Sequence, residues 1–131
     1  MSKGYTMIEL VVVIILIGIL SAVAVPRFER RIELTELKGE KDFTYNLWEE
    51  LEVYAEEQKE LTGIETWPEH PLSVLGRTRN VIITYSLGIP DEDNEWQFDG
   101  TKLYHRRMNN EIWYFEYNPN TFFLSEHPTK L

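Results

Sequence analysis

The start of the chain combines a segment of almost pure hydrocarbon with a following segment dense in charge. Residues 10–25 carry no charged side chain, and between Tyr5 and Val25 the one charged residue is Glu9. As a helix, these 21 residues rise about 31 Å, which is close to the roughly 30 Å of a bilayer core. Because a single span in lipid can satisfy its own backbone only as a helix, we predict a membrane-spanning helix over residues 5–26.

Two residues weaken this helix locally. Gly18 is conformationally permissive, and Pro26 lacks an amide donor and crowds the preceding turn. The sequence therefore predicts a kink or a brief loss of helix between them. Gly39 predicts a second bend near residues 38–40, because an interior glycine weakens a helix by about 1 kcal/mol relative to alanine.

Past the span, the helix is predicted to continue into water as an amphipathic half over residues 27–61. Its apolar side chains recur at spacings of four, four and three, at Phe43, Leu47, Leu51 and Tyr54. Such spacing forms one stripe on a helix, which we expect to pack on a sheet, while the surrounding glutamates form a solvated face. The helix end is signalled by Thr-Gly at 62–63.

Residues 62–131 form a C-terminal region of short runs rich in β-branched and aromatic residues. The runs predicted to be strands are 81–85, 95–98, 101–106, 111–117 and 121–125. Asp99-Gly100 is a strong hairpin signal between two of them, and Asn109-Asn110 is a weaker one. We predict an antiparallel meander of three or four strands. The predicted fold class is α+β, with a long N-terminal hydrophobic helix packed on a small antiparallel β-sheet head.

Composition narrows the function. The chain has 131 residues, enough for one small domain on one anchor, and its 22 acidic and 13 basic residues give a net charge of −9. That charge disfavours nucleic acid, although the basic run at 105–107 leaves a DNA contact as an alternative. The absence of cysteine excludes disulfides, thiolate metal sites and cysteine nucleophiles. Because the three histidines fit no catalytic or zinc motif, we expect no enzyme.

One acidic run, PDEDNEWQFD, gathers hard oxygen ligands. Its candidate ligands for Ca²⁺ are Asp91, Asp93, Glu95 and Asp99. The run lacks the glycine found at the sixth position of an EF-hand loop, and a plain solvated turn is the alternative.

The apolar segment by itself admits other interpretations. A secretory signal peptide would place a cleavage site after a short apolar region, and Ala22-Val23-Ala24 offers one. A plain membrane anchor is a further alternative. Neither explains the polar and charged pattern around Glu9.

The stretch KGYTMIEL, followed by an apolar run and Pro26, resembles the N-terminus of type IV prepilins and type II secretion pseudopilins. In that family a basic leader ending in glycine precedes an aromatic residue, and a glutamate stands fifth after the cut. Gly4, Tyr5 and Glu9 fit this spacing. At the position directly after the cut, where this chain has Tyr5, phenylalanine is commoner in the family. Gly18 and Pro26 also stand where the family often has glycine and proline.

The resemblance implies that residues 1–4 are a leader, which a prepilin peptidase removes after Gly4 before Tyr5 is N-methylated. It also implies that Glu9 meets the Tyr5 amine of a neighbouring subunit, in a filament assembled through residues 5–26. A lone carboxylate in hydrocarbon costs several kcal/mol, and a partner's ammonium offsets part of that cost. A glutamate that only snorkels to the interface is the alternative.

Orientation involves a conflict between two signals. Arg27, Arg30 and Arg31 follow the span and only Lys3 precedes it, so a count of basic residues would leave the C-terminal part in the cytoplasm. The resemblance implies the reverse, because the leader must face a cytoplasmic peptidase. We therefore expect a single-pass protein of the inner membrane, with a cytoplasmic N-terminus and a periplasmic or otherwise extracytoplasmic head.

These observations predict a structural subunit of a type IV pilus-like filament, most specifically a pseudopilin of a type II secretion system. Expected partners are a prepilin peptidase, homologous subunits and an inner-membrane assembly platform. A minor type IV pilin for adhesion or DNA uptake is the first alternative, and the absence of a C-terminal disulfide weighs against it. A membrane-anchored enzyme or sensor is the second.

Overall fold

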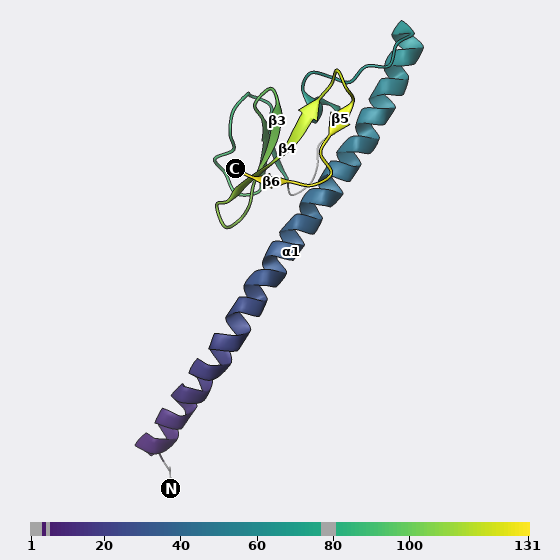
Figure 1. Ribbon diagram of the computed structural model, residues 1–131. Helices are drawn as coiled ribbons and strands as arrows, with labels where there is room; N and C mark the ends of the chain where they lie inside the picture. Colours follow the sequence, from purple (N-terminus) through teal and green to yellow (C-terminus); the bar gives the residue numbers. More distant parts are fainter. Residues whose placement is uncertain (1–3, 5, 77–80) are drawn as a thin grey trace. The chain divides into compact units, whose positions relative to one another are not determined.

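The computed structural model describes residues 4, 6–76 and 81–131 (Figure 1). It contains one long helix, one 3₁₀ turn and six short strands. Their bounds are α1 Met7–Thr62, η1 Pro71–Val74, β1 Ile82–Thr84, β2 Glu95–Phe98, β3 Lys102–Arg106, β4 Ile112–Asn118, β5 Phe123–Leu124 and β6 Thr129–Lys130. Residues 1–37 and 38–131 form two compact units, called here the N-terminal unit and the C-terminal unit.

Helix α1 is helical throughout its 56 residues, including Gly18, Pro26 and Gly39. The structure therefore shows no loss of helix between Gly18 and Pro26, and the alternative of a kink stays a prediction. A proline removes one backbone hydrogen bond and crowds the turn before it. The unbroken run of helical residues on both sides shows that this local defect does not end the helix.

The apolar part of α1 is long and apolar enough to cross a membrane. Its most apolar window of 18 residues has a mean hydropathy of 3.0, and none of that window is buried inside the chain. By length and composition, it is the one such helix among the described residues. The predicted span therefore presents its hydrocarbon surface entirely outward.

The sheet belongs to the C-terminal unit and has the strand order β1-β2-β3-β4-β5, with β6 also paired to β4. Strands β2, β3 and β4 form an antiparallel meander, which confirms the central part of the prediction. Strand β1, however, runs parallel to β2, because residues 85–94 carry the chain back to the end of the sheet where β1 began. Strand β6 is two residues long and was not predicted.

The core lies between the sheet and the C-terminal part of α1 (Figure 1). Leu47 and Leu51 of the predicted stripe are fully buried, and Phe43 stacks on Trp96 with a centroid distance of 3.9 Å. Burying a leucine side chain contributes about 1.5–3 kcal/mol, so this stripe fixes the helix to the sheet. The α+β fold class is confirmed.

Candidate functional site

The predicted processing site lies at the start of the N-terminal unit. Gly4 is exposed, and an added Cβ there would meet no atom within 4 Å among the described residues. Packing inside the subunit therefore gives no reason for glycine at this position. Tyr5, which the sequence predicts to become the mature N-terminus, lies outside the described residues.

Thr6 and Glu9 form a reciprocal cap at the start of α1. The Glu9 amide donates to Oγ1 of Thr6 over 3.2 Å, and the Thr6 amide donates to Oε2 of Glu9 over 3.4 Å. The first four amides of a helix have no partner within it, and this capping box satisfies two amides at that end. Thr-x-x-Glu at 6–9 is the sequence signature of a capping box, and the cap was not among the predictions.

Capping the helix is a third role for Glu9, in addition to the two that the sequence suggested, which are pairing with a neighbouring subunit and snorkelling to the interface. Its side chain is exposed, and the hydrogen bond that it accepts is long. A carboxylate has two oxygens and about four acceptor positions, so Glu9 can hold this bond and still receive an ammonium from outside. Capping and subunit pairing are therefore compatible roles for one carboxylate.

Gly18 and Pro26, the other residues predicted to serve assembly, lie on the exposed surface of α1. An added Cβ at Gly18 would meet nothing within 4 Å among the described residues. The side chains around it remain exposed, such as Ile17 at 58% and Ile19 at 59%. An apolar surface of this extent requires lipid or another chain to cover it.

The structure does not bring the four predicted calcium ligands together. Among the described residues, no group of three histidine, aspartate or glutamate side chains is placed to hold a metal ion. Glu95 is buried and accepts from Thr84 Oγ1 at 2.6 Å and from the amides of Asp91 and Glu92. Asp93 lies 3.8 Å from Arg106 Nε. Calcium binding stays a prediction, and it would have to compete with these contacts.

Asp99 closes the turn between β2 and β3. Its Oδ1 accepts from the amides of Thr101 at 2.8 Å and Lys102 at 2.6 Å, and its Oδ2 accepts from the Tyr104 hydroxyl at 2.9 Å. Burial alone would raise the pKa of Asp99, but these hydrogen bonds to the charged form outweigh it and hold the pKa below its ordinary value. Burial and the Asp99 carboxylate together raise the pKa of Tyr104 to about 12.

Because the pKa of Asp99 is lowered in the folded state, its carboxylate stabilises the fold above its ordinary pKa of 3.8. That stabilisation is lost as pH falls through the folded-state pKa. We expect Asp99→Asn to lower the free energy of unfolding at pH 7 by about 1–3 kcal/mol and to flatten its acid dependence. Thermal unfolding of the full chain in detergent between pH 7 and pH 2 measures both effects. Asp42→Asn, at an exposed position, is the control, and equal curves for the two variants would contradict the prediction.

A buried charge cluster joins α1 to the β3–β4 turn inside the C-terminal unit. Oε1 of Glu40 accepts from Nε of Arg107 at 2.7 Å and from Nη2 at 2.5 Å. The guanidinium of Arg107 also lies 4.1 Å from the centre of the Trp113 ring. Nδ1 of His105 is 3.4 Å from Oε2 of Glu40, which is ion-pair distance without hydrogen-bond geometry. No local pattern in the sequence points to this cluster, because Glu40 and Arg107 lie 67 positions apart.

The cluster also changes the interpretation of the basic run at 105–107. His105 and Arg107 are only 5% and 4% exposed, and Arg106 is bonded to Asn110. Two of the three side chains that suggested a DNA contact are therefore enclosed in the core. Arg107 instead serves the attachment of the sheet to the helix.

Comparisons with known proteins agree with the N-terminal site. Residues 1–25 match the family described as the prokaryotic N-terminal methylation motif. Over 35 residues the chain is 57% identical to the type IV narrow pilus major component PilA5 of Thermus thermophilus. That stretch covers 27% of this chain and 28% of the relative. No solved structure is significantly similar to the chain.

The N-terminal motif, the outward-facing apolar helix and the α+β fold define one class of protein. These findings support a type IV pilin-like family for the chain. The similarity to PilA5 is confined to about a quarter of each chain, and it does not distinguish a pilus subunit from a secretion pseudopilin.

Proposed function

We propose that the chain is a structural subunit that polymerises through residues 5–26 into a type IV pilus-like filament. The observation that carries this proposal is the methylation motif placed at the start of a helix whose apolar surface is wholly uncovered. Glu9 pairs with the Tyr5 amine of the neighbouring subunit, while Gly18 lets helices approach closely because it has no side chain. Pro26 supplies a weak point where crowded helices adjust.

Within this function, the chain is a pseudopilin of a type II secretion system, anchored in the inner membrane with the head outside the cytoplasm. A prepilin peptidase processes it and an inner-membrane platform inserts it into the filament. The second candidate is a pilus subunit, which the similarity to a pilus major component favours. Loss of secreted proteins on deletion of the gene would support the pseudopilin, and loss of surface pili alone would support the pilus subunit.

The proposal predicts a specific mature N-terminus. Removal of residues 1–4 takes away Lys3, so the side-chain net charge changes from −9 to −10 and the mature chain begins with an N-methylated Tyr5. Intact-mass analysis of subunits extracted from membranes measures this directly. Gly4→Leu is the matched variant, and it should remain uncut because it places a bulky residue at the cleavage site. Since the subunit's own structure leaves open space at Gly4, the substitution should not disturb the subunit itself. A mature chain that begins after Ala24 would contradict the proposal.

A further inference from the structure

An apolar groove of about 670 Å³ runs between α1 and the β5 region, entirely within the C-terminal unit. Tyr45 and Trp48 of the helix form one wall, and Phe123 of β5 belongs to the other. Trp48 lines the same groove as Phe123 and Leu124 of β5. Tyr45 remains 64% exposed and Phe123 47% exposed. Aromatic side chains in an open groove are typical of a surface that receives a partner.

The backbone beside the groove is strained. Phe122 has a φ of +53°, in the left-handed region that bulky residues rarely adopt. Its ring contacts Trp67 edge-on at a centroid distance of 5.6 Å, which holds the turn in place. The next residue, Phe123, lines the groove instead of joining the core. Strain of this kind often occurs where a binding surface is held in position.

The N-terminal unit offers a matching surface in residues 27–37, called here the post-span segment. Phe28 and Ile32 are 66% and 43% exposed, and with Val25 they follow the spacing of one helical stripe. The segment follows the predicted span of residues 5–26, so in the proposed topology lipid does not cover Phe28 and Ile32. Their own unit does not bury them either.

We propose that the groove of one subunit receives the post-span segment of a second copy of this chain. The inference rests on the proposed filament, in which copies share one orientation and are offset along its axis. The exposed stripe then provides a ridge for the groove, as when an amphipathic helix enters an apolar groove. The post-span segment continues directly from the span through which the subunits assemble.

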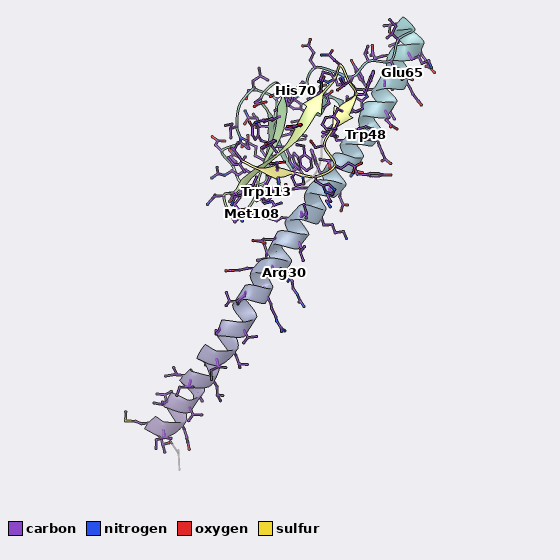
Figure 2. The ribbon with its side chains drawn as sticks, viewed as in Figure 1. Arg30, Trp48, Glu65, His70, Met108 and Trp113 are labelled. Atoms are coloured by element: carbon purple, nitrogen blue, oxygen red, sulfur yellow. The ribbon has the colours of Figure 1, made fainter. Side chains whose placement is uncertain are left out.

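Both surfaces carry charges of both signs. The groove includes Glu126 and lies beside Glu52, which accepts a hydrogen bond from Trp48 Nε1 at 2.8 Å. The post-span segment carries three exposed arginines, including Arg30, which projects from the helix (Figure 2). The groove wall also includes Lys41, and the post-span segment has three glutamates beside its three arginines, so each sign has possible partners of opposite sign. Pairs of opposite charge fix the register of an interface more than its affinity.

Cysteine crosslinking in the native membrane tests this contact, because the chain has no cysteine of its own. Ile32→Cys and Phe123→Cys are placed on full-length copies that carry different tags, and both positions are exposed, so the fold should be kept. After oxidation, we expect at least about tenfold more mixed-tag dimer than for Ile32→Cys with Met108→Cys, because assembly raises the local concentration of the matched pair. Met108 is the control because it is 64% exposed and lies away from Trp48 (Figure 2).

A third pair, Leu16→Cys on both tagged copies, reports assembly through the span independently. Span dimers together with the Ile32 and Phe123 dimer support the contact. Span dimers with no excess over the Met108 control overturn it and leave the filament intact. Absence of span dimers overturns the filament and, with it, the contact. A predominant dimer between two Phe123→Cys copies would show that heads pair with each other, which also overturns the proposal.

Discussion

Glu40→Ala is expected to destabilise the C-terminal unit by about 3–5 kcal/mol, because it removes the carboxylate that pairs with the buried charge of Arg107. The side chains of Glu40 and Arg107 are 0% and 4% exposed, so water cannot replace the lost carboxylate. A typical domain is stable by only about 5–15 kcal/mol, so this single change removes a large part of the total. Urea unfolding of the full chain in detergent, followed by tryptophan fluorescence, measures the loss, since all four tryptophans lie in this unit.

Two matched variants separate the ion pair from general effects of mutation. Glu50→Ala removes an exposed glutamate from the same helix and should change stability by less than about 0.5 kcal/mol. The double variant Glu40→Leu with Arg107→Met should be more stable than Glu40→Ala alone, because no unpaired charge remains in the core. A loss below about 1 kcal/mol for Glu40→Ala would show that the pair is not important for stability.

The residues that could be predicted from sequence are those whose signal is local. Leu47 and Leu51 were placed on the buried stripe by their spacing alone, and both are fully buried. Asp99-Gly100 lies between two strands that pair in the predicted antiparallel sense. In each case the cause lies within a few residues, so periodicity and turn chemistry are sufficient.

The features that could not be predicted depend on contacts between distant residues. Glu40 and Arg107 are 67 positions apart, and each looks like an ordinary surface charge in its own segment. The parallel pairing of β1 with β2 depends on the path of the loop between them, which no local pattern encodes. The hydrogen bonds of the acidic loop are a related case, since composition suggests ligands but does not show that Glu95 and Asp99 already accept hydrogen bonds within the chain.

At the N-terminal site, the roles of Gly4, Tyr5 and Glu9 came from the resemblance to prepilins, and the matched methylation motif confirms the family. What the resemblance did not supply was the cap formed by Thr6 and Glu9. That cap matters for experiment, because loss of Glu9 removes the cap together with the proposed pairing to a neighbour's Tyr5 amine. Glu9→Ala by itself therefore cannot show which of them assembly requires.

Glu9→Ala is expected to abolish filament assembly while leaving processing after Gly4 intact. Without the carboxylate, the ammonium of a neighbouring Tyr5 is uncompensated at the membrane edge, at a cost of about 3–5 kcal/mol where it is fully buried. Insertion of the single helix should become easier, because one costly group leaves the lipid. The measurement is the yield of sheared filaments relative to total processed subunit.

Two further variants separate the charge of Glu9 from its cap. Thr6→Ala keeps the carboxylate but loses the capping box, which costs about 0.5–2 kcal/mol of helix stability and should reduce filament yield only slightly. Glu9→Gln keeps an oxygen that can accept from the Thr6 amide, as glutamine does in capping boxes, but it removes the charge. If pairing with the neighbour's amine drives assembly, Glu9→Gln should fail as completely as Glu9→Ala. Wild-type filament yield in Glu9→Gln, together with a loss in Thr6→Ala, would assign Glu9 to the helix cap instead of the subunit contact.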